Sequence, residues 1–249
     1  MRFADALIGL GGVSGSGDGH FDPRLVADLP QPARRMLQRA IPSGAPLARR
    51  TMLELSGEMT ANGRRMAVTA RELLVPGRGF AWEARAALGP LWLRVRDHYL
   101  DGDGAVDVRL LGVVPLGTNR GQDVAASSRG RLAAESFWAP TTLLPQAGAR
   151  WTAVDDQRAT VHMSIDGQEE SVTFAVDDDG ALSEVTMLRW GDVQVQEHQR
   201  IPYGFGVVEE RTLEGYTIAS TLRGGWWYGT DRYRPDEAST FEVQRARYA

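Results

Sequence analysis

The sequence predicts a mainly β (α+β) protein, built as a large curved antiparallel sheet or half-barrel of about a dozen strands with two helices packed across it. Apolar and polar residues alternate along many short segments, which is the pattern of strands with one buried face. Joints rich in glycine, proline and aspartate separate these segments, as in antiparallel hairpins. Strands and helices do not alternate in the βαβ manner, which argues against a doubly wound fold.

The composition is that of a soluble globular chain. Of its 249 residues 43% are hydrophobic and 24% charged, enough to build a core in one large β domain. The net charge of -4 provides no basic field for nucleic acid or for an anionic membrane surface, so neither partner is expected. The absence of cysteine excludes disulfides, thiolate metal sites and a cysteine nucleophile.

The N-terminal residues 1–21 are expected to form a flexible segment, followed by one antiparallel β domain over residues 22–249. Residues 9–19 read GLGGVSGSGDG, a linker composition, and no strand precedes them as a dinucleotide-binding loop would require. The apolar stretch 1–10 is short and contains Asp5, so neither a signal peptide nor a membrane span is predicted, and a cytoplasmic location is the default expectation.

The first helix is predicted near residues 22–41, where Asp22 can cap the N-terminus and Pro23 suits the first turn. Pro30 and Pro32 must kink or divide this helix because proline removes a backbone donor. Alternation then begins around Leu53, and its apolar parity predicts further strands at 66–75, 79–87, 91–100 and 105–114.

The second helix is predicted near residues 123–138, with Asp123 as its cap and Pro140 after its end. The Asp166-Gly167 pair is suited to a type I′ hairpin turn between two of the strands that follow. These strands are expected at 149–154, 159–165, 168–176, 181–190, 193–200, 207–213, 216–223 and 240–246.

No metal or cofactor is predicted. The acidic runs at 101–107 and 177–180 superficially resemble calcium loops, but they lie between strands, where aspartate and glycine form turns. The four histidines are scattered, without metal-ligand spacing, and solvated or rim positions are expected for them. A Gly-x-Ser-x-Gly nucleophile elbow is also absent.

Two carboxylates stand out because the pattern places them among apolar or aromatic residues. Asp97 shares strand parity with Leu93, Val95 and Tyr99, so it is expected on the inner face, as a structural partner of an arginine or as a functional group with a raised pKa. Glu135 shares a helical side with Arg131 and with Trp138. This group is either a local brace or the wall of a pocket whose arginine anchors an anion.

Tryptophans are spread over the predicted strands, and Trp82 shares parity with small or apolar neighbours. It is therefore expected to fill the core or to line a cavity, because a strongly curved sheet must be filled by side chains, by helices or by a guest. The candidate ligand-binding residues are Trp82, Asp97, Arg131, Glu135 and Trp138.

Several short strings resemble a family of uncharacterised bacterial proteins known as a domain of unknown function, over residues 22–245. They are Glu135-Ser-Phe-Trp138-Ala-Pro140, Leu29-Pro30, Phe80-Ala-Trp82, Arg96-Asp97-His-Tyr99 and Trp151-Thr-Ala-Val-Asp155. The resemblance implies a shared fold and no catalytic assignment. The expected architecture is similar to the half-barrel of periplasmic lipoprotein carriers, in which a curved sheet and helices enclose an apolar cavity, although a signal peptide is not expected here.

Three functions follow as hypotheses. The leading one is binding of a hydrophobic or amphipathic small molecule in a cavity between the curved sheet and the helices. The second is an enzyme in which Asp97 or Glu135 acts as general acid or base and Arg131 stabilises an anion. The third is a structural or interaction domain with a filled core. The sequence leaves the ligand and the oligomeric state open.

Overall fold

One continuous antiparallel sheet organises the molecule. The computed structural model describes residues 1–12, 19–61 and 63–249. Within them 13 strands follow the linear order β6-β5-β4-β3-β2-β1-β13-β12-β11-β10-β9-β8-β7, so β6 and β7 are free edges and the sheet stays open. The strands are β1 Thr51–Ala61, β2 Arg64–Val75, β3 Gly79–Leu88, β4 Leu91–Leu100, β5 Asp103–Leu110, β6 Val114–Arg120, β7 Arg150–Ala153, β8 Arg158–Ile165, β9 Gln168–Val176, β10 Leu182–Gly191, β11 Gln199–Leu213, β12 Tyr216–Trp226 and β13 Ser239–Tyr248.

Tight turns give the sheet its antiparallel order. Asp101-Gly102, Asp166-Gly167 and Glu214-Gly215 each have positive φ at both residues, as type I′ hairpin turns require. The second acidic run also serves a turn, because a side-chain oxygen of Asp177 accepts backbone N–H bonds from Asp179 and Ala181. The predicted mainly β fold with hairpin connections is confirmed.

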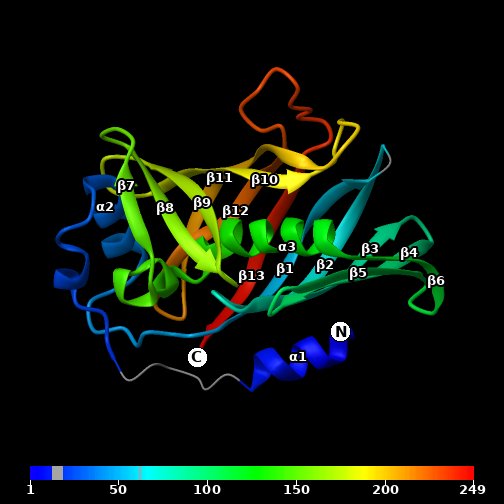
Figure 1. Ribbon diagram of the computed structural model, residues 1–249, viewed down its shortest axis with the longest axis horizontal. Helices are drawn as coiled ribbons and strands as arrows, with labels where there is room; N and C mark the ends of the chain where they lie inside the picture. Colours follow the sequence, from blue (N-terminus) through cyan, green and yellow to red (C-terminus); the bar gives the residue numbers. More distant parts are fainter. Residues whose placement is uncertain (13–18, 62) are drawn as a thin grey trace.

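The pair β1 and β13 joins the two halves of the sheet. Strand β13 pairs with β1 on one side and with β12 on the other, so the last strand is inserted beside the first. The sheet curves strongly around the resulting trough, and helix α3 (Gln122–Ala134) lies along its concave side (Figure 1). The half-barrel prediction is thereby confirmed.

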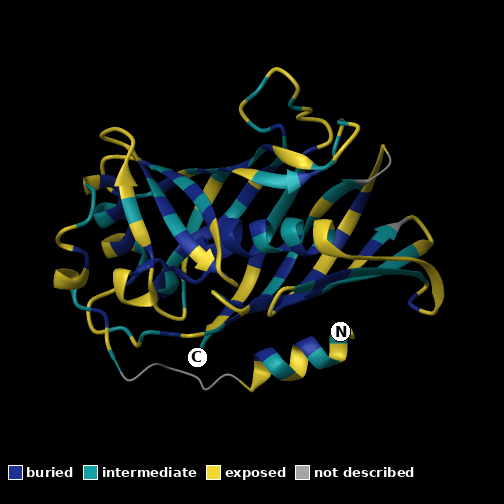
Figure 2. Cartoon of the chain, viewed as in Figure 1, coloured by how far each residue is buried: buried dark blue, intermediate teal, exposed yellow. Residues whose placement is uncertain are grey.

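Helix α3 fits closely inside the sheet because small residues face the strands. It contacts β4 and β5 on one arm of the sheet and β9 and β10 on the other. A side chain at Gly130 would meet Arg189 at 3.0 Å, so a larger residue there would require that arginine to shift. The helix continues as the 3₁₀ turns η2 (Glu135–Trp138), η3 (Pro140–Leu143) and η4 (Pro145–Ala147). Figure 2 shows buried residues along the C-terminal half of α3, and η2 and most of η3 are buried, whereas η4 is exposed.

The predicted helix over 22–41 is divided into two short pieces, η1 (Pro23–Val26) and α2 (Gln31–Ala40). Asp22 caps the first by accepting a hydrogen bond from the Arg24 N–H, as expected. Residues 27–29 form a turn and α2 starts after Pro30, because proline is tolerated only in the first turn of a helix. Helix α2 packs against β8, β9 and β12, and its residues Met36 and Leu37 belong to the same core cluster as the inner residues of these strands.

The N-terminal segment departs from the expectation for residues 1–21, because Phe3–Gly11 form helix α1. Its buried residues Ala6 and Leu10 pack with Val75, Ala81 and Leu100 on the outer face of the sheet. Burial of this apolar stripe stabilises a helix that linker composition alone did not suggest. Residues 13–18 of the glycine tract lie outside the described residues.

Two predicted strand boundaries were wrong. The apolar run predicted as one strand over 105–114 contains a turn at Leu111-Gly112, and an additional strand, β6, follows it. Residues 192–198 form a loop where most of a strand over 193–200 was predicted, and β11 runs without interruption over residues 199–213 where a strand over 207–213 was predicted. Bulges near Val207 let β11 continue through its irregular pattern.

Candidate functional site

A buried ionic cluster lies where α3 crosses the inner face of the sheet. The guanidinium of Arg131 donates to three carboxylates: its Nε to Oε1 of Glu135 at 2.7 Å, its Nη1 to Oδ2 of Asp97 at 2.8 Å, and its Nη2 to Oε1 of Glu72 at 3.0 Å. The guanidinium carbon also lies 5.0 Å from the ring centroid of Trp82 and 4.6 Å from that of Phe80. Aromatic faces of this kind attract the cation.

The strand register explains this arrangement. Glu72 on β2 is opposite Trp82 on β3, which is opposite Asp97 on β4. Since residues directly opposite in a sheet point to the same face, all three side chains form one transverse row on the concave side. Arg131 lies over that row, and its helical neighbour Glu135, four residues later, completes the cluster.

The cluster contains three carboxylates for one guanidinium. Burial, followed by the nearby Glu135 carboxylate, raises the pKa of Glu72 well above its usual value, and Arg131 offsets only part of this. The nearby Asp97 carboxylate raises the pKa of Glu72 further. Burial lowers the pKa of Arg131, but its three carboxylate neighbours raise that pKa overall. Burial and the neighbouring carboxylates therefore favour the protonated form of Glu72 more than they would in water.

Four of the five predicted site residues meet here, and the fifth does not. Trp82, Asp97, Arg131 and Glu135 are together, whereas the indole Nε1 of Trp138 donates to the backbone oxygen of Ala219 on β12 at 2.9 Å. Trp138 packs in the core against Phe137, with ring centroids 4.8 Å apart. Whether these five residues contact a ligand stays a prediction.

Glu72 was not among the residues predicted for the site. A signal was available, because Glu72 shares parity with the inward residues Met66, Val68, Ala70 and Leu74 of β2. It is only 3% exposed. The same reasoning that selected Asp97 therefore applies to Glu72 as well.

A second buried carboxylate ties α3 to the opposite arm of the sheet. Glu170 on β9 has a fully buried side chain and accepts hydrogen bonds from Nε of Arg129 at 2.9 Å and from Nη2 of Arg200 at 3.1 Å. Arg129 and Arg131 thus anchor the same helix to β9 on one side and to β2 and β4 on the other. These ion pairs are consistent with the brace considered for Arg131, and they add Arg129 to it.

A pocket of about 700 Å³ lies just beyond the ionic cluster, at the C-terminal end of α3. Leu132 and Ser136, the chain neighbours of Arg131 and Glu135, form part of its wall together with Met163 and Ile165 on β8. Ser136 is only 1% exposed, and its hydroxyl has no hydrogen-bond partner among the described residues. Further lining residues include Leu47, Ala48, Arg49, Val75, Arg78, Thr141, Ala147 and Ala149.

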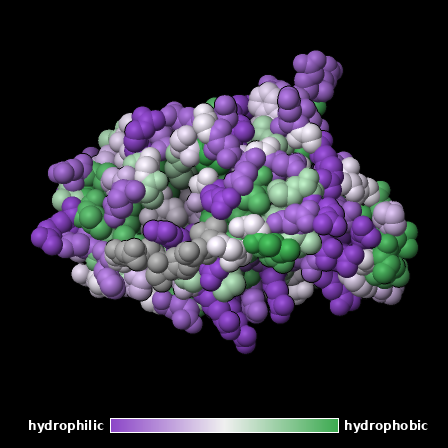
Figure 3. Space-filling model, turned by 60° about the horizontal axis from the view of Figure 1, so that its bottom comes forward, coloured by the Kyte–Doolittle hydropathy of each residue, from purple (hydrophilic) through white to green (hydrophobic). Residues whose placement is uncertain are grey.

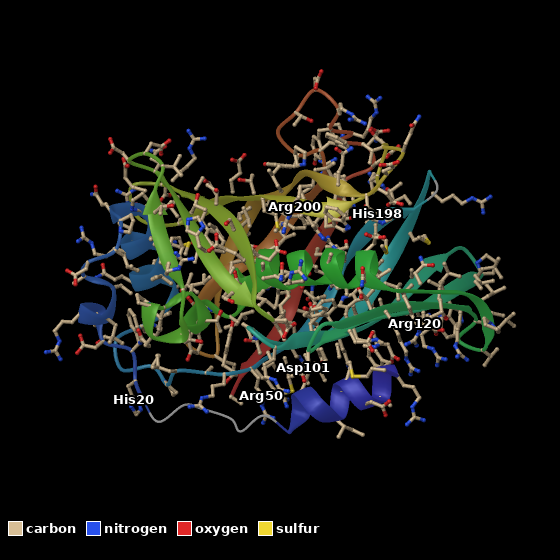
Figure 4. All side chains as sticks on the ribbon, viewed as in Figure 1. His20, Arg50, Asp101, Arg120, His198 and Arg200 are labelled. Atoms are coloured by element: carbon tan, nitrogen blue, oxygen red, sulfur yellow. The ribbon has the colours of Figure 1, made fainter. Side chains whose placement is uncertain are left out.

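A second pocket of about 540 Å³ lies at the N-terminal half of α3 and reaches Asp97. Arg120 on β6 and His198 before β11 line it from opposite sides of the helix (Figure 4). Arg189 stacks on Trp226 there, with its guanidinium carbon 4.9 Å from the ring centroid. Acidic and basic groups alternate around this pocket, so its charge does not favour one class of ligand.

Among residues 1–12, 19–61 and 63–249, no group of three or more histidine, aspartate or glutamate side chains could hold a metal ion. In the same residues, no helix is long and apolar enough to span a membrane.

The comparisons with known proteins support a shared fold without an activity. A family model described as "Family of unknown function (DUF6544)" matches residues 19–235, close to the range of 22–245 expected from the short strings. No functionally curated protein matches the chain. Several solved structures are weakly similar, two of which are given below, and the proposal that follows rests on the residues of this chain alone.

The first is a LolA superfamily protein from Nitrosomonas europaea, with 9% identity and a TM-score of 0.45, covering 90% of this chain and 94% of that one. The second is a DUF1329 family protein from Desulfovibrio piger, with 13% identity and a TM-score of 0.35, covering 88% of this chain and 93% of that one.

Proposed function

This chain belongs to the Family of unknown function (DUF6544), and we propose from its own residues that it binds an amphipathic small molecule with a long apolar body and a carboxylate head group. The pocket beside Ser136 carries the proposal. Its volume of about 700 Å³ falls in the range of small-molecule sites. It also lies between the sheet and the end of α3, as the leading hypothesis requires.

The apolar part of the ligand is assigned to the inner wall of the pocket. Leu132, Met163 and Ile165 are each less than a tenth exposed and present aliphatic or thioether surface. Covering such surface with an acyl chain contributes about 25 cal/mol per Å² of apolar area removed from water. A chain-like ligand suits this wall better than a compact polar one.

The polar part of the ligand is assigned to the groups without partners. Arg49 is exposed at the rim and makes no ion pair among the described residues, whereas Arg78 at the same rim is paired with Asp101 at 3.0 Å. A carboxylate at the rim can therefore pair with Arg49.

The acid–base alternative has less support. Asp97 and Glu135 do meet at a common point, as that hypothesis requires, but each gives an oxygen to Arg131. A carboxylate held in this way is a positioning group for α3 rather than a free base. General acid or base chemistry by Asp97 or Glu135 stays a prediction.

Fluorescence titration with dansyl-undecanoic acid tests the proposal. We expect saturable binding that Ala147→Trp weakens at least about tenfold by occupying the pocket. Ala153→Trp, at an exposed alanine on β7 away from the pocket, is the matched control and should bind as the parent does. Arg49→Gln should weaken binding of the acid more than that of the corresponding alcohol. Equal affinity in all four proteins would refute the proposal.

A further inference from the structure

We propose that the end of the sheet formed by hairpin β5–β6 and the start of β4 docks on the surface of an anionic lipid bilayer. This surface, called the apolar tip, consists of Leu91, Leu111, Val113, Val114 and Leu116. It is distant in sequence from the pocket beside Ser136, and the proposal does not depend on ligand binding there.

The apolar tip exposes more hydrophobic surface than folding explains. Its five residues are between 43% and 69% exposed, and every residue of β6 is exposed. Leu111 donates its N–H to the backbone oxygen of Trp92, so the two hairpin ends lie side by side. Figure 3 shows hydrophobic side chains gathered at this end of the molecule. Contiguous apolar patches of this kind mark interaction sites.

The turn at the apolar tip contains a leucine at a position where a different residue would make the protein more stable. Leu111 has φ 50° and Gly112 φ 74°, so the first two residues of this three-residue connection, which ends at Val113, have the same positive φ values as the two-residue hairpin turns of the sheet. Those turns place Asp101, Asp166 or Glu214 at the equivalent position. A leucine in the left-handed region carries a conformational cost, which indicates a role for its side chain outside the fold.

A tryptophan lies directly behind the apolar tip. Trp92 points to the outer face, and a side chain at Gly112 would meet its ring at 2.7 Å, so the indole lies under the turn. Arg85 covers the other side, with its guanidinium carbon 4.7 Å from the ring centroid. Tryptophan is enriched at the boundary between acyl chains and head groups, and Trp92 would lie at this boundary when the apolar tip enters the acyl chains.

A row of arginines follows behind Trp92. Arg85 on β3 is directly opposite Arg94 on β4, and Arg94 is directly opposite Arg109 on β5. Like charges in such positions destabilise a sheet. Arg109 is paired with Asp107 at 2.9 Å, but neither Arg85 nor Arg94 has an ion pair in the part of the chain that the structure describes. Arg85 and Arg94 can therefore pair with the anionic groups of a ligand.

The order of these features identifies the partner. Apolar residues come first, Trp92 next and the arginines last, which matches the sequence of acyl chains, interface and phosphates in a bilayer. The net charge of -4 gave no reason to expect such a surface, because a chain-wide sum does not reveal three arginines aligned by register.

Co-sedimentation with vesicles tests the proposal. We expect the protein to bind phosphatidylcholine vesicles containing phosphatidylglycerol, to bind pure phosphatidylcholine more weakly, and to dissociate in high salt. Val113→Ser with Val114→Ser should lower the partition coefficient by about tenfold or more. Arg85→Gln and Arg94→Gln should each lower it about fivefold. Leu111→Asn should also weaken binding, although asparagine suits the turn and keeps the protein folded.

Two matched controls make the result specific. Val208 on β11 is 69% exposed, as Val113 is, so Val208→Ser removes the same apolar surface elsewhere. Arg247→Gln removes an exposed arginine at the far end of β13. Both should bind as the parent does, and so should Ala147→Trp, which separates docking from occupancy of the pocket. Absence of binding to anionic vesicles, or equal loss in the controls, would overturn the proposal. So would a lipid-free dimer disrupted by the serine variants.

Discussion

Nη2 of Arg131 lies 3.0 Å from Oε1 of Glu72, and this bond ties the last turns of α3 to the middle of β2, 59 residues earlier in the chain. The same guanidinium reaches β4 through Asp97, so one side chain holds the helix against two strands of the concave face. Because these charged groups are buried, they stabilise the fold only when all the partners are present. Removing one partner leaves the others buried without compensation.

Replacing Arg131 should therefore be strongly destabilising. Arg131→Met leaves the carboxyl groups of Glu72, Asp97 and Glu135 buried without their cation, and we expect the free energy of unfolding in urea to fall by about 3–5 kcal/mol. Arg247→Met, at an exposed arginine, should change it by less than about 1 kcal/mol. A loss of equal size in both variants would contradict the role assigned to the cluster.

Glu72 should make the stability depend on pH in a defined direction. Burial raises its folded pKa above the ordinary value of 4.5, so as pH rises past that value the unfolded chain releases the proton first. The Glu72 contribution to the free energy of unfolding is therefore fully retained below about pH 4.5 and decreases as pH rises toward the folded pKa.

The variant Glu72→Gln isolates this effect, because the amide resembles a protonated carboxyl and does not titrate. We expect it to be at least as stable as the parent at neutral pH and to lack the decrease above pH 4.5 in urea unfolding. Glu237→Gln, at an exposed position, should keep the parental pH dependence. A strongly destabilised Glu72→Gln protein at neutral pH would show that Glu72 is needed as an anion.

His98 should weaken the docking of α1 at low pH. It lies on β4 beneath Phe3, with ring centroids 5.9 Å apart, and it is 3% exposed rather than solvated as the strand parity suggested. Burial lowers its folded pKa, an effect that Asp97 opposes and Arg120 reinforces. The neutral imidazole thus stabilises the docked state above the ordinary pKa of 6.5, and this stability is lost as pH falls.

Hydrogen exchange of residues 3–11 measures this effect. After correction for intrinsic rates, we expect exchange to accelerate between pH 7 and pH 5, and we expect His98→Phe to remove the acceleration while keeping the helix packed. His20→Phe, at an exposed histidine, is the control. The same acceleration in His98→Phe would assign the effect to another group, such as the ion pair between the N-terminus and Asp103.

The turn at Leu111 should gain stability from a residue suited to positive φ. Leu111→Asn is expected to raise the free energy of unfolding by about 1 kcal/mol, because asparagine tolerates the left-handed region better than leucine. Leu188→Asn, at an exposed leucine within β10, should give no such gain. Thermal unfolding checks both, and a destabilised Leu111→Asn would show that the turn carries no strain.

Much of the sheet could be predicted because its information is local. Alternation in 168–176 and the Asp166-Gly167 turn each depend on a few adjacent residues. Errors arose where local signals conflict. The apolar run around Leu111 conceals a turn, and Pro202 and Gly204 interrupt the pattern of the continuous strand β11.

The candidate site, too, could be predicted only where its signals are local. Parity alone placed Trp82 and Asp97 on the inner face, and helical spacing alone joined Arg131 to Glu135. Neither strand parity nor helical spacing could show that the strand residues meet the helix residues, because no local signal determines where α3 crosses the sheet. The position of Trp138 in the core against β12 was undetermined for the same reason.

By itself, the sequence determined the fold class, the parity of the strands and the chemistry available on each face, because these depend on periodicity and on turn residues. Only the tertiary structure decided that α3 lies in the trough, that Arg131 lies over the row of Glu72, Trp82 and Asp97 and donates to its two carboxyl groups, and that Arg85, Arg94 and Arg109 align on the outer face. These relationships depend on register and on contacts between residues far apart in the chain, where the free energy of burial, rather than local preference, selects the arrangement.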